Sequence, residues 1–354
     1  MNNGKVDAHS PMLNNAINSL YAFSAMQAGI GAFYYAPGGS QGNQGGIPQE
    51  EISLENNFSV LGGLQTLKHV LEKTDQTPQV KKALADIQIM LYGGKTVNGY
   101  ETLGLLSFLY NGAYDPKKGI FFTHGTAIDP KSLHDWQPDR SEDGGAMAVD
   151  INTWGISALG AETIDKWYGK GTALAIWQKV RQQGGYYNNG KLWGVGYTLR
   201  NNTGDTPEHI MSTEWTAGAI NILQSLIAYY DKTDIDTADL KDDLTQMTEG
   251  VRHLRNDNYL AAQFDGATPQ EYFVTLPKSV GLAYLYASKR FPIPFGWNAN
   301  TLPSTTSNSW IIMNEFRFNP FQYLGRLESE NYDIPKSVDI SSENEEGIRG
   351  RGSK

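Results

Sequence analysis

Apolar residues recur every three to four positions along most of the chain, which is the spacing of amphipathic helices. This pattern predicts helices over residues 12–28, 54–73, 78–91, 102–110, 150–159, 162–183, 213–230, 236–255, 278–289 and 307–318. Residues 184–199 instead alternate apolar and polar positions and contain several glycines, which predicts a small β-hairpin. The expected fold class is therefore all-α with one small β insertion.

The predicted helices are of two kinds. One kind is rich in small residues and almost continuously apolar, as in TWGISALG and WTAGAINILQSLIAYY, and such helices are buried. The other kind carries charge along one face, as in KKALADIQIM and TADLKDDLTQMTEGVRHL. Alternating inner and outer helices predict two concentric rings, an (α/α) toroid of five or six helix pairs. A linear α-solenoid would repeat with a period of about 34–47 residues, and the sequence shows no such repeat.

Length and local composition suggest one domain and a tail. Chains of this size often form a single barrel, and we expect residues 1–325 to form one (α/α) barrel catalytic domain. Residues 326–354 are acidic and contain many Ser, Asn and Gly residues, which predicts a flexible tail.

Charge and cysteine content narrow the classes of partner and chemistry. The chain has 38 acidic and 29 basic residues, a net charge of −9, and no run of Lys or Arg. This argues against nucleic acid as a partner, since phosphates require a basic surface, and favours a neutral or weakly charged glycan. The absence of cysteine excludes disulfides and thiolate nucleophiles. The six histidines lack zinc-binding spacing, so we expect neither a metal nor another cofactor.

Location and assembly are inferred from what the sequence lacks. No stretch of about 18 apolar residues is present to span a membrane. The first ten residues do not show the basic and then apolar pattern of a leader. We expect a monomeric periplasmic or secreted protein whose leader has been removed, with a cytoplasmic location as the alternative.

Several predicted helices begin with a polar cluster next to an aromatic residue. Three of these clusters contain a carboxylate, namely Glu55, Asp150 and Glu214, and a fourth occupies residues 303–310. Capping of helix N-termini explains each cluster taken alone. In a toroid, however, the N-termini of the inner helices converge on one mouth, so the three carboxylates would surround one cavity.

Carboxylates gathered in this way suit acid/base chemistry, because mutual repulsion raises one pKa and leaves a proton donor beside an ionised base. Glu214 is next to Trp215, an apolar neighbour, and is the candidate general acid. Asp150 begins a polar turn with Asn152 and is the candidate base that activates water. Glu55 is the reserve for either role.

Aromatic and polar side chains near these acids are candidates for binding sugar, since the apolar face of a pyranose stacks on a flat ring. The candidates are Trp154, Trp193, Tyr197, Trp215, Trp310, Asn56, Glu208 and His209. Helix packing is the simpler explanation for any single ring.

The helix alternation occurs together with Glu214-Trp215, with Asp-x-x-x-Trp at 150–154, and with Ser-Thr-Thr-Ser-Asn-Ser-Trp at 304–310 before Asn-Pro-Phe at 319–321. In this combination the chain resembles the six-hairpin (α/α)6 glycosidases over about residues 10–325. The resemblance implies an (α/α)6 toroid and cleavage of glycosidic bonds, often with inversion by an Asp/Glu pair. Relatives on this scaffold include lyases and epimerases.

The leading hypothesis is a glycoside hydrolase that cleaves a neutral or weakly charged polysaccharide or oligosaccharide by acid/base catalysis, with inversion expected. One alternative is a polysaccharide lyase or sugar epimerase, in which Tyr197 or His209 would move a proton and Arg200 would bind a uronate. The other alternative is a glycan-binding protein without catalysis.

Overall fold

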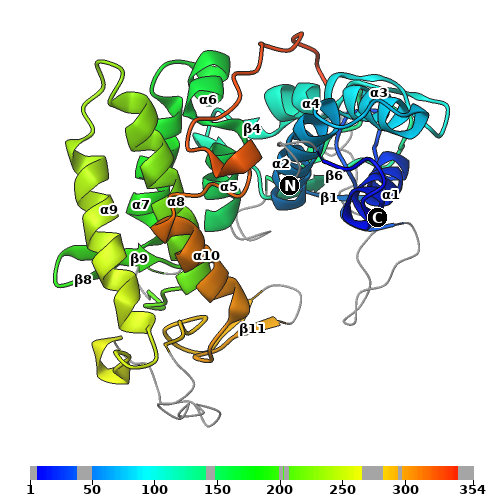
Figure 1. Ribbon diagram of the computed structural model, residues 1–354. Coiled ribbons are helices and arrows are strands. Elements are labelled where there is room, and N and C mark those ends of the chain that lie inside the picture. The colour runs from blue at the N-terminus through cyan, green and yellow to red at the C-terminus, as the bar shows by residue number, and fades with distance from the viewer. Residues whose placement is uncertain are drawn as a thin grey trace, which may run out of the picture. The chain divides into compact units, whose positions relative to one another are not determined.

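Helices dominate the computed structural model, accompanied by small antiparallel sheets of two or three strands (Figure 1). The structure describes residues 6–37, 50–140, 148–198, 202, 207–264, 282–293 and 297–341. The chain divides into two compact units, which we call the first unit (Met1–Ser141 with Asp333–Lys354) and the second unit (Glu142–Tyr332). The mainly helical prediction is confirmed, whereas a closed (α/α)6 ring and a single domain over residues 1–325 stay predictions.

The first unit contains α1 (Pro11–Ala25), α2 (Leu54–Glu72), α3 (Pro78–Tyr92) and α4 (Leu105–Gly112). Helix α3 packs against the other three. Strands β1 (Glu51–Ser53), β6 (His124–Thr126) and β7 (Gln137–Pro138) form an antiparallel sheet in the order β1-β6-β7. Two smaller pairs are β2 (Gly94–Lys95) with β3 (Glu101–Thr102), and β4 (Tyr114–Asp115) with β5 (Ile120–Phe121).

A cluster of three polar side chains joins the strands of the three-stranded sheet. The Nδ1 atom of His124 lies 2.5 Å from a Glu51 carboxylate oxygen, and its Nε2 atom lies 3.0 Å from an Asp139 carboxylate oxygen. Glu51 is in β1, His124 is in β6, and Asp139 directly follows β7. The cluster therefore joins all three strands, and β1 leads directly into α2.

The second unit contains α5 (Val149–Leu159), α6 (Ala161–Tyr168), α7 (Thr172–Gly184), α8 (Thr213–Tyr230), α9 (Ala238–Val251) and α10 (Thr305–Glu315). Its strand pairs are β8 (Gly185–Asn188) with β9 (Lys191–Val195), and β10 (Phe291–Ile293) with β11 (Trp297–Ala299). The short 3-10 helices are η1 (Arg252–Leu254), η2 (Ala261–Gln263) and η5 (Tyr323–Gly325). The β-hairpin predicted at residues 184–199 is confirmed by the pairing of β8 with β9.

Burial separates the helices of the second unit as their sequences indicated. Helix α8 is buried along almost its whole length and packs against α5, α9 and α10 (Figure 1). Helix α9 buries only one face, through residues such as Leu240, Met247 and Val251. The expected difference between apolar inner helices and charged outer helices therefore holds for α8 and α9.

The single helix predicted at 162–183 is wrong, because the structure forms α6 and α7 instead. Gly169 and Gly171 have φ angles of 112° and 83°, a region that disfavours other residues. The buried carboxylate of Asp165 then accepts hydrogen bonds from the backbone N–H groups of Gly171 and Ala173, at 2.8 and 3.0 Å. These bonds satisfy free donors at the start of α7, so the break is stabilised as well as permitted.

The helix predicted at 278–289 is also wrong over its described part, residues 282–289, which are extended. Leu285 and Ala287 form bridges with Pro303 and Ser212, respectively. Residues 278–281 lie outside the described residues.

The C-terminal segment makes specific contacts over residues 326–341, although its composition indicated flexibility. In the second unit, the Thr163 hydroxyl donates a hydrogen bond to the Glu330 carbonyl oxygen at 3.0 Å. In the first unit, the Ile340 carbonyl oxygen accepts a hydrogen bond from the Trp136 backbone N–H at 2.8 Å. Residues 342–354 lie outside the described residues.

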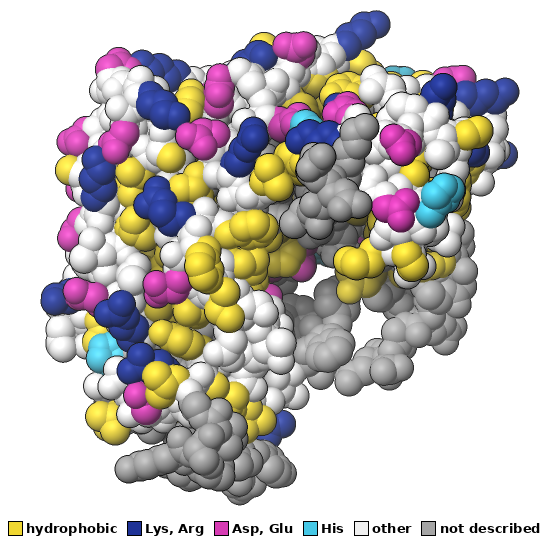
Figure 2. All heavy atoms as spheres, in the orientation of Figure 1, with side chains coloured by type: hydrophobic (Ala, Val, Ile, Leu, Met, Phe, Trp, Pro, Cys, Tyr) yellow, Lys and Arg dark blue, Asp and Glu magenta, His cyan; other side chains and the backbone are white. Residues whose placement is uncertain are grey.

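Charged side chains of both signs are interspersed on the face shown in Figure 2, without a broad basic patch on its described residues. None of the helices in the described ranges is both long and apolar enough to cross a bilayer.

Candidate active site

Two helices of the second unit begin beside the same extended segment. The backbone N–H of Val149, at the start of α5, donates to the Tyr197 carbonyl oxygen at 3.0 Å. The backbone N–H of Ser212, just before α8, donates to the Val195 carbonyl oxygen, also at 3.0 Å. The segment after β9 therefore fixes the N-termini of α5 and α8 next to each other.

A second extended segment relates α8 to α10 in the same way. The backbone N–H of Thr213, the first residue of α8, donates to the Tyr286 carbonyl oxygen at 3.0 Å. The backbone N–H of Ser304, just before α10, donates to the Tyr284 carbonyl oxygen at 3.1 Å. The N-termini of α5, α8 and α10 consequently lie along one edge of the second unit, as the sequence predicted for its inner helices.

This arrangement brings Asp150 and Glu214 to the same edge, because each is the second residue of its helix. Asp150 is buried, with 5% of its surface exposed, and its Oδ1 accepts a hydrogen bond from the backbone N–H of Ile151 at 2.9 Å. Glu214 is partly exposed. The free N–H groups at both helix starts favour negative charge at these positions.

Tyr286 lies beside Glu214, within the electrostatic influence of both carboxylates. Its hydroxyl donates a hydrogen bond to the Glu214 side chain. Burial and the negative charge of Glu214 raise the pKa of Tyr286, and the more distant charge of Asp150 adds to the shift. Tyr286 therefore remains a protonated donor, and both carboxylates act electrostatically on the same phenol.

Aromatic rings surround Glu214. The Tyr197 and Trp215 rings make an edge-to-face contact with centroids 4.5 Å apart, and both rings also contact Tyr286. Burial raises the pKa of Tyr197, whereas a hydrogen bond with Ser212 opposes that shift. The indole N–H of Trp215 is buried and has no hydrogen-bond partner among the described residues. Tyr197, Trp215 and Tyr286 thus form one cluster of rings beside the start of α8.

A further aromatic cluster lies about one turn along the helices from the carboxylates. Trp154 and Trp310 are the sixth residues of α5 and α10, and their rings are 6.1 Å apart. The corresponding residue of α8 is Gly218, where an added Cβ would lie 3.6 Å from the Trp154 indole nitrogen. Trp310 is only 5% exposed and also contacts Phe321, so it packs between helices, whereas Trp154 is partly exposed.

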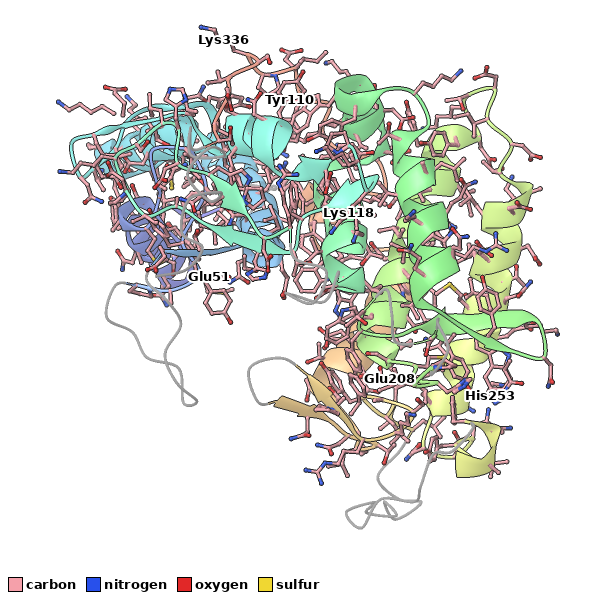
Figure 3. All side chains as sticks on the ribbon, turned by 180° about the vertical axis from the view of Figure 1, so that it is seen from behind. Glu51, Tyr110, Lys118, Glu208, His253 and Lys336 are labelled. Carbon is pink, nitrogen blue, oxygen red and sulfur yellow. The ribbon has the colours of Figure 1, made fainter. Side chains whose placement is uncertain are left out.

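Trp193 belongs to a different group of side chains. Its ring packs with the buried cluster of Tyr186, Met211, Leu254 and Phe264, whereas Tyr197 and Trp215 pack with Ile210 and Ala287. Trp193 also stacks on His253, just beyond α9, and His253 is labelled in Figure 3. The hairpin therefore places Trp193 away from the ring cluster that surrounds Glu214.

Glu208 and His209 lie on the segment that leads to α8. Glu208, which is labelled in Figure 3, is exposed, and its carbonyl oxygen accepts a hydrogen bond from the Lys289 ammonium group. His209 adopts a φ angle of 50°, which is uncommon for a residue with a side chain. The roles of both residues stay predictions. Arg200 lies outside the described residues.

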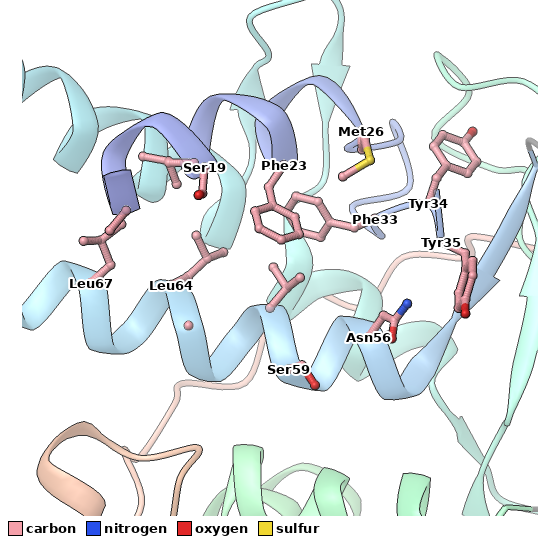
Figure 4. A pocket seen from close by; sticks show the side chains of 14 residues that line it. Ser19, Phe23, Met26, Phe33, Tyr34, Tyr35, Asn56, Ser59, Leu64 and Leu67 are labelled. Carbon is pink, nitrogen blue, oxygen red and sulfur yellow. The ribbon is translucent and has the colours of Figure 1, made fainter. Parts of the chain in front are cut away.

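Glu55 and Asn56 are in the first unit, at the start of α2. Burial raises the pKa of Glu55. Asn56 lines a cavity of about 460 Å³ between α1 and α2, where its amide lies near Tyr35 (Figure 4). Apolar side chains such as Phe23, Phe33 and Leu64 form most of the wall (Figure 4). This cavity has the volume and the apolar surface to hold a small ligand, but its lining residues include no carboxylate.

The sequence pattern did not identify Tyr286, because the surrounding residues were expected to form a helix. The signal that was present is the alternation in LAYLYAS, in which Leu285 and Ala287 are buried and Tyr286 is half-buried. Alternation over this length is typical of a strand. Within the described ranges, no group of three His, Asp or Glu residues is arranged to hold a metal ion.

Comparison with known proteins gives distant likenesses in structure. No protein-family model and no curated protein matches the sequence. A family 76 glycoside hydrolase from a bovine Bacteroides thetaiotaomicron strain is similar with 13% identity and a TM-score of 0.41, over 88% of this chain and 52% of that one. A β-1,3-1,4-glucanase from Paenibacillus sp. X4 is similar with 12% identity and a TM-score of 0.38, over 84% and 65% of the two chains. The chain thus spans about half the length of the first protein. TM-scores of this size do not establish a shared fold.

Proposed function

We propose that the chain is a glycoside hydrolase whose acid/base pair is Glu214 and Asp150 in the second unit. The observation that carries this proposal is that α5 and α8 begin beside the same extended segment, so that both carboxylates lie at one edge of the second unit. Cleavage of a glycosidic bond needs one carboxyl group to protonate the leaving oxygen and another to assist the attack.

The two carboxylates have different surroundings, which suggests different roles. Glu214 is partly exposed and lies among the rings of Tyr197, Trp215 and Tyr286, where a sugar can approach it. We assign it the general acid. Asp150 accepts a hydrogen bond from a backbone N–H at the start of α5, where the helix N-terminus favours negative charge. We assign it the base that activates water, with inversion at the anomeric carbon. Glu55 stays a reserve candidate.

The proposed substrate is a neutral or weakly charged glycan. The net charge of −9 disfavours polyanions, and the partly exposed Trp154 and Trp215 provide flat apolar surfaces for pyranose rings. We further propose a monomeric, exported protein with an (α/α)6 fold.

The alternative function is that of a lyase or epimerase, in which Tyr197 or Tyr286 would act as the catalytic base. Such enzymes need a base that removes a carbon-bound proton, and a base works best when its pKa is near the working pH. Burial raises the pKa of Tyr197, and burial with the Glu214 charge raises the pKa of Tyr286. Both phenols are therefore weak candidates for the base, which favours hydrolysis.

The test is hydrolysis of a panel of soluble glycans: mixed-linkage β-glucan, α-mannan, dextran and polygalacturonate. We expect wild-type protein to release reducing ends from a neutral member and Glu214→Gln to lose at least about 10³-fold in rate. Glu315→Gln, an exposed residue of α10, is the matched control and retains the wild-type rate. Unsaturated products from polygalacturonate would favour the lyase. Wild-type turnover by folded Glu214→Gln would refute the proposed mechanism.

A further inference from the structure

Another cavity, of about 260 Å³, lies in the second unit between the β8–β9 hairpin and α9. Its lining residues come from the hairpin, from α9 and from η1, and they are Asn188, Asn189, Lys191, Trp193, Gln246, Glu249, Gly250 and His253. None of the residues that surround Glu214 is among them. The cavity therefore shares no lining residue with the proposed active site.

The hairpin is held firmly against α9. Asn189 and Gly190 both have positive φ angles, 49° and 76°, as a two-residue type I′ turn requires. Gly250 lets the Trp193 backbone approach so closely that an added Cβ would lie 2.4 Å from the Trp193 Cα. The Gln246 side-chain carbonyl accepts the Leu192 backbone N–H at 2.7 Å. The cavity wall is thus built before any ligand arrives.

Two flat rings form one side of the cavity. The Trp193 indole and the His253 imidazole stack with centroids 4.1 Å apart and an interplanar angle of 11°. Tyr186 and Phe264 pack against Trp193 and hold it in place. The Nδ1 atom of His253 is buried and has no hydrogen-bond partner among the described residues.

Polar groups surround these rings. In the part of the chain that the structure describes, the Asn189 amide, the Lys191 ammonium and the Glu249 carboxylate make no hydrogen bond or ion pair. The cavity therefore combines an aromatic surface with an amide, a cation and an anion that have unused hydrogen-bonding capacity.

We propose that this cavity binds one saccharide unit of a glycan chain, as an accessory site apart from Glu214 and Asp150. A pyranose presents an apolar face and a rim of hydroxyls, each of which donates and accepts hydrogen bonds. The stacked rings suit the face, and the amide, ammonium and carboxylate groups suit the rim. A phosphate ligand is disfavoured, since the lining has one lysine and also a glutamate. The choice of a glycan as ligand class rests on the proposed function.

If the accessory site binds glycan, the protein should migrate more slowly in a native gel that contains the polymer than in a gel without it. This retardation should not require catalysis. The probes are the neutral soluble polymers of the panel, mixed-linkage β-glucan, α-mannan and dextran, each cast in a native gel. The full-length Glu214→Gln protein serves as the background, so that the probe is not consumed. We expect His253→Ala and Trp193→Ala in this background to weaken polymer binding about five- to ten-fold, a loss typical of one aromatic contact.

Tyr187→Ala is the matched control, because Tyr187 is an exposed aromatic residue of the same hairpin that does not line the cavity. It should migrate like its parent. His253→Ala tests the site independently if Trp193→Ala folds poorly. Thermal melting of both variants is compared with that of the parent protein. In the catalytically active background, hydrolysis of a short oligosaccharide by His253→Ala should stay within about two-fold of wild type.

The outcomes separate this inference from the proposed function. If folded His253→Ala and Trp193→Ala both bind polymer as tightly as their parent, the accessory site is refuted, even where Glu214 proves catalytic. If polymer binding depends on Trp193 and His253 but the wild-type protein cleaves nothing, the accessory site stands and the hydrolase proposal fails.

Discussion

The starts of α2 and α8 use the same local device and differ in what surrounds it. In both helices an extended segment ends at a serine that caps the helix, and the second helical residue is a glutamate, Glu55 or Glu214. The Ser53 hydroxyl accepts the Asn56 backbone N–H at 3.4 Å. The Ser212 hydroxyl accepts the N–H of Trp215 at the same distance. Local sequence alone therefore does not distinguish the two glutamates.

Neighbouring segments make the difference. At α8, residues 284–287 bring the Tyr286 hydroxyl to Glu214, and the start of α5 brings Asp150. At α2, the adjacent cavity is lined mainly by apolar side chains, and burial raises the pKa of Glu55. A capping motif supplies a carboxylate, but segments distant in sequence must supply the proton partner and the second acid.

The sharpest test of this comparison uses the leaving group of the substrate. A dinitrophenolate leaves without protonation, so a variant that lacks only the general acid should recover with a dinitrophenyl glycoside of the sugar that the wild type cleaves. We expect Glu214→Gln to lose about 10³-fold or more on the polymer but to approach wild-type kcat/KM on the activated glycoside. Asp150→Asn should be slow on both substrates, because activation of water is still required.

Glu55→Gln in the same assay decides which glutamate is the acid. A large loss on the polymer with recovery on the dinitrophenyl glycoside in Glu55→Gln, but not in Glu214→Gln, would transfer the role to Glu55. Recovery of Asp150→Asn on the activated glycoside would reverse the assignment of acid and base.

The sequence predicted the positions of several helices, and of acidic residues at their starts, because both depend on local patterns. Helix α2 begins at Leu54 and helix α8 spans Thr213–Tyr230, as the periodicity indicated. Asp150 and Glu214 were found because caps and early acids mark helix starts. Their grouping with Tyr197 and Trp215 followed from the expected convergence of helix N-termini.

The failures occurred where distant segments or single glycines decide the structure. The segment LAYLYAS has enough apolar residues for a helix, but its pairing with Ser212 and Pro303 makes it extended, and Tyr286 was missed for that reason. The break between α6 and α7 depends on Gly169 and Gly171. Trp193 was assigned to the main site, whereas its position depends on the close approach of the hairpin to Gly250.

Asp165 is a buried carboxylate outside the proposed acid/base pair, and it tests whether a buried acid must be catalytic. It accepts hydrogen bonds from the Tyr230 hydroxyl at 2.9 Å and from the backbone N–H groups of Gly171 and Ala173. These bonds give Asp165 a structural role, in which it links α6 to the start of α7 and to the C-terminal end of α8. We expect Asp165→Ala to lower the free energy of unfolding by about 3 kcal/mol in denaturant titrations. Asp239→Ala, an exposed acid of α9, should change it by less than about 0.5 kcal/mol.

Residual activity of Asp165→Ala, measured well below its unfolding midpoint, should match wild type within a few-fold. A loss as large as that of Glu214→Gln in folded protein would show that burial and hydrogen bonding do not separate structural from catalytic acids in this chain.

Tyr286→Phe tests the feature that distinguishes α8 from α2. The hydroxyl donates a hydrogen bond to Glu214, and such a bond favours the ionised carboxylate. Its removal should raise the pKa of Glu214, so the alkaline limb of the kcat/KM profile moves to higher pH. We expect a fall in kcat/KM of roughly ten- to fifty-fold. Tyr284→Phe, two residues earlier on the same extended segment, is the control. An unchanged profile in Tyr286→Phe would remove Tyr286 from the mechanism.

The smallest effect is expected for the stability contribution of Glu55. Burial raises the pKa of this carboxyl above its ordinary value of 4.5, so the folded state favours the protonated form. The stabilising contribution of such a group is present below its unfolded pKa and is lost as the pH rises through the folded pKa. At pH 7 an ionised Glu55 therefore destabilises the fold, and Glu55→Gln should raise Tm by roughly 1–3 °C. The gain should disappear near pH 4, where the wild-type residue is also neutral.

Glu101→Gln, an exposed residue of the same unit, should show no such pH dependence. A Glu55→Gln protein that is less stable than wild type at pH 7 would mean that the ionised carboxylate is stabilised in place, and the contrast between the two glutamates would then fail.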